Sequence, residues 1–187
     1  MKNILDSVKL LLVLMGVGIF GMQPASAVNM NIKIKADVFI PPCKINGGNE
    51  DIKVHFDKMS LYEVNGYKNA KTTTVTINCE YYQGTPYIRM DGPLLSGSGD
   101  NNVLSTQGTN PSTLGIALYQ GSDVNASYPL KIGPGDQGKG YKITRGLTGQ
   151  NAREGEFTFT AVPYKNGTGT LNAGVFSATA TMSIHYV

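Results

Sequence analysis

The stretch Gly174-Val-Phe-Ser-Ala-Thr-Ala-Thr-Met-Ser-Ile-His-Tyr-Val187 alternates apolar and polar residues up to the last position of the sequence. Successive side chains of a β-strand point to opposite faces of its sheet, so this period of two predicts a strand with one buried face. The residues of that face are Phe176, Ala178, Ala180, Met182, Ile184 and Tyr186. An ordinary last strand of a core and a strand that a partner chain captures both fit this pattern.

A second alternating stretch lies towards the other end of the sequence and reads Val28-Asn-Met-Asn-Ile-Lys-Ile-Lys-Ala-Asp-Val38. Apolar side chains stand at 28, 30, 32, 34 and 38, which again predicts a strand with one apolar face. Lys33 and Lys35 on the polar face would discourage aggregation of a free strand. The pattern leaves open whether this strand packs in its own domain or is donated to another molecule.

Before this stretch, residues 1–27 have the pattern of a secretory signal peptide. Lys2 and Lys9 accompany the start of an apolar run over 10–22, and small residues stand at the two positions that a signal peptidase reads. We therefore expect cleavage after Ala27. The apolar run is shorter than the roughly 20 residues of a membrane span, so we expect no stable membrane insertion. What remains has the size of one domain.

The sequence contains two cysteines, Cys43 and Cys79. In a secreted protein an even number of cysteines indicates a disulfide, and closing this loop would stabilise the fold by about 4 kcal/mol. Together with His55 and His185, the cysteines are too few at these spacings for a metal site. We therefore expect a disulfide, no metal and no other cofactor.

The charge of the chain argues against nucleic acid as a partner. The formal net charge of the whole sequence is +3, and removal of Lys2, Asp6 and Lys9 with the signal peptide lowers it to +2. No run of basic residues remains, whereas nucleic-acid binding depends on clustered Lys and Arg side chains.

The rest of the sequence has the composition of short β-strands joined by turns. Residues 71–79 and 156–162 are rich in β-branched or aromatic residues with a period of two. Shorter candidate strands lie at 52–56, 87–90, 114–119 and 141–144. Clusters of Gly, Asn, Asp and Pro separate these segments. Many short strands in one domain predict a β-sandwich.

The cysteines do not fit the usual immunoglobulin framework, which pairs two cysteines around a core tryptophan. The sequence has no tryptophan, and Cys43 lies beside Pro41 and Pro42 on the first strand of the domain. The disulfide would thus join the first strand to the long strand that ends at Cys79.

An enzyme and a carbohydrate-binding module are the two alternatives to a structural protein. An enzyme needs a recognisable nucleophile or base, and neither His55 nor His185 lies in a catalytic motif. Glu154 and Glu156 flank Gly155 and have the character of a solvated strand entry. We therefore expect no catalytic residue. The second alternative is a carbohydrate-binding β-sandwich, and glycan binding in a screen would favour it.

Taken together, these features resemble the subunits of chaperone–usher pili. That family carries a penultimate Tyr, a Gly fourteen places from the end and alternating apolar residues between them, as Gly174 and Tyr186 do here. It also carries a disulfide near the first strand and an alternating N-terminal extension. Within the family, the chain is most similar to the minor tip-adaptor subunits of P pili. The stretches that carry this similarity are 39–46, 101–104, 114–121 and 157–164.

The resemblance implies an all-β fold, an incomplete immunoglobulin-like sandwich (the pilin fold) that lacks its last strand. The pilin domain would span 39–187, and residues 28–38 would form an N-terminal donor-strand extension. The residues that would enter a neighbour's groove are Met30, Ile32, Ile34, Ala36 and Val38. Ala36 stands where family extensions usually have Gly, and its extra methyl group is expected to slow insertion or restrict the choice of partner.

The resemblance also implies partners. A periplasmic pilus chaperone would supply the missing strand, and an incoming subunit's extension would replace it at the outer-membrane usher. The implied chaperone-binding residues are Gly174, Phe176, Ala178, Ala180, Met182, Ile184, Tyr186 and Val187. Neighbouring subunits, with the tip adhesin among them, complete the partners, and the expected destination is a pilus on the cell surface. The major rod pilin of the same family is an alternative to the adaptor, as is a carbohydrate-binding adhesin.

Overall fold

The structure is a computed structural model that describes residues 30–48 and 50–187. The predicted signal peptide over 1–27, and Val28 and Asn29 at the start of the predicted extension, lie outside the described residues. Contacts divide the chain into two units with a boundary between Asp37 and Val38. Residues 30–37 contain no strand. The strand predicted over 28–38 is therefore absent from its described part, where no strand pairs with it.

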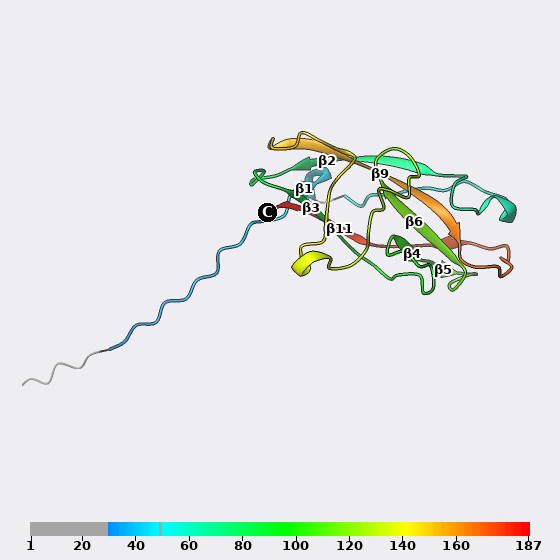
Figure 1. The fold of residues 1–187 in the computed structure, drawn as a ribbon, viewed down its shortest axis with the longest axis horizontal. Helices are drawn as coiled ribbons and strands as arrows, with labels where there is room; N and C mark the ends of the chain where they lie inside the picture. The colour runs from blue at the N-terminus through cyan, green and yellow to red at the C-terminus, as the bar shows by residue number, and fades with distance from the viewer. Residues whose placement is uncertain (1–29, 49) are drawn as a thin grey trace, which may run out of the picture. The chain divides into compact units, whose positions relative to one another are not determined.

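The second unit is a β-sandwich (Figure 1). Its larger sheet contains, in spatial order, β1 (Lys44–Ile45), β2 (Lys71–Asn78), β9 (Glu154–Lys165), β6 (Leu114–Gln120) and β4 (Val103–Ser105), with β8 (Leu147–Thr148) also paired to β9. The facing sheet contains β11 (Thr181–Tyr186), β3 (Pro86–Asp91) and β7 (Tyr141–Lys142), and β10 (Phe176–Ser177) pairs with β5 (Gln107–Gly108). Three 3-10 turns complete the elements: η1 (Asn46–Gly48), η2 (Leu61–Glu63) and η3 (Asp136–Gly138). Every strand pair is antiparallel.

The two strongest sequence patterns form the centre of the larger sheet. β2 pairs with β9 over eight positions, with Val75 opposite Phe157 and Thr72 opposite Thr160. Val75 and Phe157 are buried on the inner face, whereas Thr72 is exposed on the outer face. This division is the one that a period of two predicts. The strands predicted at 71–79 and 156–162 are confirmed, and β9 extends beyond the prediction at both ends.

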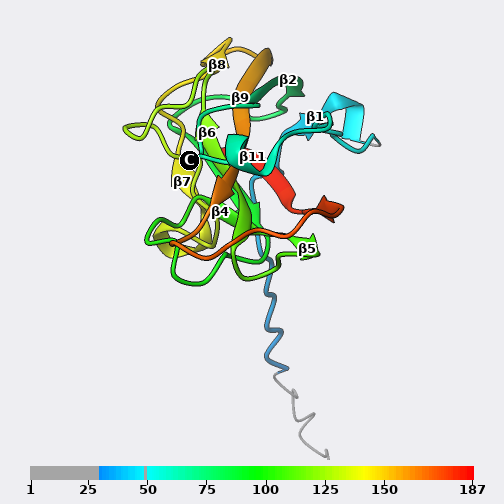
Figure 2. The ribbon, with the colours of Figure 1, turned by 90° about the vertical axis from the view of Figure 1, so that its right-hand side faces the viewer.

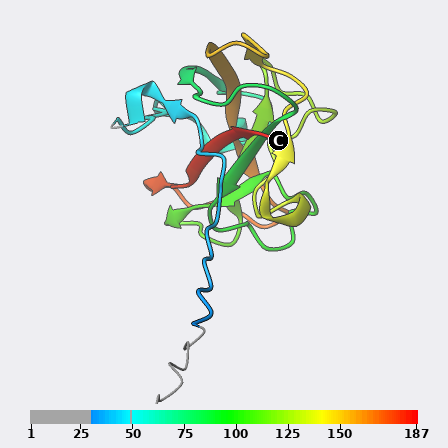
Figure 3. The same cartoon turned by 90° about the vertical axis from the view of Figure 1, so that its left-hand side faces the viewer.

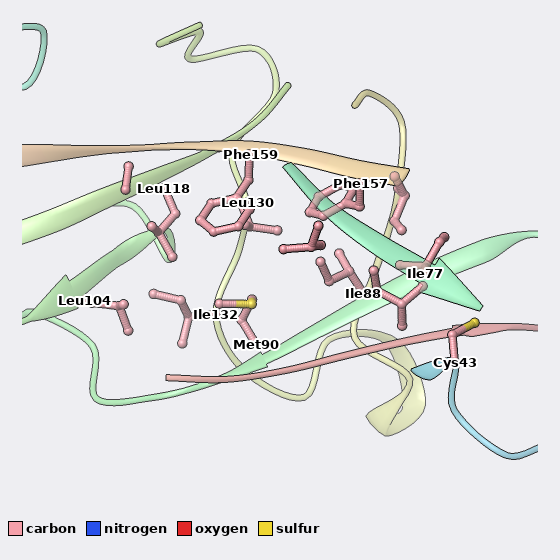
Figure 4. Packing of buried hydrophobic residues seen from close by; sticks show 14 of the residues in the cluster. Cys43, Ile77, Ile88, Met90, Leu104, Leu118, Leu130, Ile132, Phe157 and Phe159 are labelled. Carbon is pink, nitrogen blue, oxygen red and sulfur yellow. The ribbon is translucent and has the colours of Figure 1, made fainter. Parts of the chain in front are cut away.

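The core lies between the sheets, and residues from both contribute to it (Figure 4). Ile88 and Met90 of β3 pack into one cluster with Ile77 of β2 and Phe157 of β9. The segment between β6 and β7 adds the buried Leu130 and Ile132 without forming a strand. The disulfide between Cys43 and Cys79 is present at one end of this cluster.

The prediction of one continuous strand over Gly174–Val187 is wrong. β10 and β11 are separate, and residues 178–180 between them belong to no ladder. The segment changes partner here, because Ser177 pairs with Gln107 of β5 whereas Thr181 pairs with Asp91 of β3. The strands predicted at 87–90 and 114–119 are confirmed as β3 and β6, and that at 141–144 is shorter than predicted.

Candidate functional site

β11 presents one open edge. Along its other edge it pairs with β3 over six positions, ending with Tyr186 opposite Pro86 (Figure 3). On the open edge, a single backbone hydrogen bond reaches another part of the described chain: the amide of Cys43 donates to the carbonyl of Ile184 at 2.7 Å. The remaining N–H and C=O groups of this edge find no strand to pair with among residues 30–48 and 50–187, which makes the edge a template for another strand.

An extended segment without a ladder lies over the same core. In residues 51–57, the half-buried side chains of Ile52, Val54 and Phe56 alternate with exposed polar ones. No backbone–backbone hydrogen bond joins these residues to the rest of the described chain. A strand was predicted at 52–56; its alternation is present, but its ladder is absent because no described strand lies beside it.

We give the name acceptor groove to the half-buried apolar residues of these two unpaired segments. Its half-buried lining residues are Ile52, Val54, Phe56, Phe176, Ala178 and Met182, which all pack against one core cluster. One end is marked by the rings of Phe56 and Phe176, whose centroids are 6.2 Å apart. The other end is marked by the hydrogen bond from Cys43 to Ile184. Figure 2 shows β10 beside β5 at one end of the C-terminal segment. An added β-strand with an apolar face could pair with the open edge of β11 and cover this lining.

The structure places the predicted chaperone-binding residues at different depths. Phe176, Ala178 and Met182 are half-buried and line the groove, where a captured strand would reach them. Ile184 and Tyr186 are fully buried in the core. Ala180 is exposed in the break between β10 and β11, where it does not share the buried face that the alternation predicted. The physical reason is again the change of partner strand.

Gly174 occupies a position without room for a side chain. A Cβ built there would overlap the hydroxyl oxygen and the Cβ of Thr109. The amide of Thr109 also donates to the carbonyl of Val175 at 3.4 Å, so the two backbones pass close together. Glycine is thus required for the approach of this segment to β5.

The end of the last strand is fixed by backbone bonds and burial. The amide of Val187 donates to the carbonyl of Thr85 at 3.0 Å, and the amide of Thr85 donates to Val187 at 2.9 Å. Burial raises the pKa of the Tyr186 phenol, and the backbone of Asn151 opposes this shift in part. No hydrogen-bond partner satisfies the Tyr186 hydroxyl within the described residues. Tyr186 therefore serves as a core anchor for β11.

Asp57 and His185, next to the segments that carry the acceptor groove, have shifted pKa values. The hydrogen bond and the charge of Lys71, 2.7 Å from the carboxylate, lower the pKa of Asp57. Partial burial and then the charge of Lys139 lower the pKa of His185, whose ring stacks on Tyr87 with centroids 6.3 Å apart. None of these side chains is among the six that line the groove, so the lining itself is apolar.

The predicted donor residues are solvent-exposed. Met30, Ile32 and Ile34 expose 84%, 83% and 87% of their surface, and Val38 exposes 99%. Ala36 is also exposed. Apolar side chains in such a row are costly in water, and one dry face would bury them all.

Sequence reasoning missed one wall of the groove. Ile52, Val54 and Phe56 were expected in a strand but were given no functional role. The signal was available in the alternation of apolar and polar residues from Ile52 to Asp57. The alternation could not show that this segment has no neighbouring strand, because it describes the two faces of a strand and not the hydrogen bonding along its edges.

Among residues 30–48 and 50–187, no three His, Cys, Asp or Glu side chains gather as a metal site would require. Over the same residues, no helix has the length and hydropathy of a membrane span.

The fold and the groove define a pilus subunit: an immunoglobulin-like sandwich that is short of one strand. The chain belongs to the fimbrial protein family, whose model matches residues 29–187. It is 42% identical to the fimbrial adapter PapF of Escherichia coli, covering 84% of this chain and 88% of that protein. It is 41% identical, with the same coverage, to the minor fimbrial protein PrsF of Escherichia coli.

Solved structures agree with this assignment. The P pilus adaptor subunit PapF is 36% identical, with a TM-score of 0.52, covering 81% of this chain and all of that one. A subunit in a chaperone–usher pilus structure has a TM-score of 0.57 at 21% identity, covering 86% and 96% of the two chains, which shows the shared fold. The predicted family and the all-β, immunoglobulin-like fold are thereby confirmed, and the chain is a structural pilus subunit.

Proposed function

We propose that this chain is an adaptor-type subunit that accepts one β-strand into its groove and donates another from its extension. The observation that carries the proposal is the acceptor groove, with unpaired backbone on both edges and an apolar floor. The similarity to PapF supports the adaptor position in the fibre rather than the rod. This role needs no catalytic group, because assembly consists of strand pairing and burial.

A periplasmic chaperone is the proposed first occupant of the groove. Its strand would pair with the free edge of β11 and cover Phe176, Ala178 and Met182, while its basic residues hold the end of the chain at Val187. At the outer-membrane usher, the extension of an incoming subunit would replace that strand. The subunit would thus pass through the periplasm to a pilus on the cell surface, with the tip adhesin or another subunit as its neighbour.

The extension is the proposed donor, with residues 28–38 separate from the pilin domain at 39–187 and from the signal peptide at 1–27. Burial of Met30, Ile32, Ile34 and Val38 at about 1.5–3 kcal/mol each gives an upper bound of roughly 6–12 kcal/mol. Each ladder bond adds about 0.5–1.5 kcal/mol. Ordering a free strand opposes these gains by about 1–2 kcal/mol per residue, so the completed acceptor sandwich must supply much of the driving force.

Charge substitutions on adjacent residues test the acceptor role. Val54→Asp places a carboxylate on the floor of the groove, where an unpaired charge costs several kcal/mol. Lys53→Asp is the matched control, because Lys53 is exposed on the opposite face of the same segment. Each variant is co-expressed with a pilus chaperone, and the recovered complex is quantified.

We expect Val54→Asp to reduce the complex at least tenfold relative to Lys53→Asp, which should resemble the wild type. Equal recovery of the two variants would overturn the assignment of this groove as the acceptor site.

A further inference from the structure

Residues 60–68 form an ordered loop directly after the groove wall. The side chain of Ser60 accepts a hydrogen bond from the amide of Tyr62 at 3.4 Å, and the carboxylate of Glu63 accepts one from the amide of Ser60 at 3.3 Å. The side chain of Asn65 accepts bonds from two further amides, at 3.0 and 2.9 Å. The amide of Gly66 donates to the carbonyl of Pro163 at 3.0 Å, which ties the loop to β9.

This fixed loop displays aromatic side chains to solvent. Tyr62 exposes 96% of its surface, Tyr67 exposes 75%, and Leu61 exposes 41%. Val64 and Gly66 are the buried residues of the loop. Tyrosines on a rigid support lose little conformational entropy on binding and are enriched at interfaces. We call residues 60–68 the tyrosine loop.

The tyrosine loop lies at the Phe56–Phe176 end of the acceptor groove. Val64 forms a buried cluster with Leu114 and Leu171, and Met59 and Phe176 pack against that cluster. In Figure 1, the coiled ribbon of η2 lies at the end of the sandwich away from the C-terminus. A strand that fills the groove and leaves it at this end must pass beside the loop.

The position of the chain's own extension indicates the direction of the incoming strand. Val38, where the second unit begins, is five residues before Cys43, which binds Ile184 at the far end of the groove. A donor strand antiparallel to β11 would leave at the Phe176 end and place its own domain there. The parallel orientation would place that domain over the start of the acceptor's extension and would block further growth of a fibre.

We propose that the tyrosine loop is a docking surface for the subunit whose strand fills the groove, and that it receives the apolar link following that strand. This inference rests on the proposed donor and acceptor roles. The link is represented in this chain by Phe39 and Ile40, which expose 79% and 42% of their surface before Pro41. Exposed apolar residues at this position need a cover in the fibre, and exposed tyrosines at the mouth of the groove supply one.

Charge also favours an apolar occupant. The two ionic side chains of the tyrosine loop, Glu63 and Lys68, face each other with 3.8 Å between their charged atoms. The loop therefore presents no net charge to a partner, which suits a link without charged residues better than an acidic or basic one. Phe39 and Ile40 belong to such a link, since residues 38–42 contain no charged side chain.

Two peptides from the chain's own extension separate the loop from the groove. The short peptide, residues 28–38, contains the donor strand alone, and the long peptide, residues 28–42, adds the link. Each is offered to the chaperone-bound subunit, and the dissociation rate of the strand-completed product is measured. The loop variant is Tyr62→Ser/Tyr67→Ser, and the control is Tyr81→Ser, an exposed tyrosine two residues after Cys79.

We expect the long peptide to dissociate about tenfold more slowly than the short one from the wild type and from Tyr81→Ser. In the loop variant this difference should disappear, while the short peptide behaves as before. Equal rates for both peptides on the wild type, or an unchanged difference in the loop variant, would overturn the inference and leave strand capture standing. If neither peptide entered the groove, this inference would fail, whereas the proposed function would still be decided by the comparison of Val54→Asp with Lys53→Asp.

Discussion

At the scale of single residues, the position of the C-terminal segment depends on two residues whose surroundings leave no room for a larger side chain. Gly174 faces Thr109 without space for a methyl group, and Tyr186 is completely buried in the core. The sequence pointed to both residues through their spacing from the end of the chain. The sequence could not show that Ile184 and Tyr186 are core residues while Met182 lines the groove. Alternation predicts which side chains share one face of a strand, but it does not predict how deeply each side chain is buried.

Gly174→Ala tests the close approach of this segment to β5. The added Cβ would overlap Thr109, so the backbone must shift, at a cost of about 1–3 kcal/mol in the free energy of unfolding. Thermal unfolding of the strand-completed subunit measures this loss. Gly169→Ala is the control, since its Cβ would meet the methyl group of Thr113 at an ordinary 3.4 Å. Equal stability of the two variants would show that Gly174 is not required by packing.

At the scale of elements, the strands were predicted well where both edges pair and poorly where they do not. β2 and β9 combine β-branched or aromatic residues with a ladder on each side, so that local preference and pairing agree. Residues 52–56 and the described part of the extension carry the same alternation but have no ladder. The division of the C-terminal strand into β10 and β11 could not be predicted either. It depends on where β3 and β5 lie, and the alternation of apolar and polar residues continues through the break.

The disulfide acts at this scale by tying the start of the domain to β2 near the point where Cys43 binds Ile184. Cys43→Ser would release the first segment and lower the stability of the strand-completed subunit by about 2–5 kcal/mol. The yield of chaperone complex should fall sharply, and the melting temperature of the surviving complex should decrease. Thiol labelling of the denatured, unreduced wild type should find no free cysteine. Two labelled thiols would contradict the pairing.

At the scale of the whole molecule, the fold is unfinished in a way that defines its function. The acceptor groove lacks one strand, and the extension is an alternating segment without a partner in the described chain. In the proposed function, each subunit would complete a neighbour while a neighbour completes it, and the free energy of the missing contacts would drive assembly. The fold class and the family could be predicted from sequence, whereas the open edges became visible only with the backbone hydrogen bonds.

The donor role of the extension is the central claim, and deletion of residues 28–35 tests it most directly. The truncated chain is expressed with a pilus chaperone, and the amount of complex and strand exchange with an acceptor subunit are both measured. Because these residues would serve another subunit, the complex should form at nearly the wild-type level while exchange is lost. Loss of the complex would show that they belong to the chain's own fold, and normal exchange would show that they are not the donor.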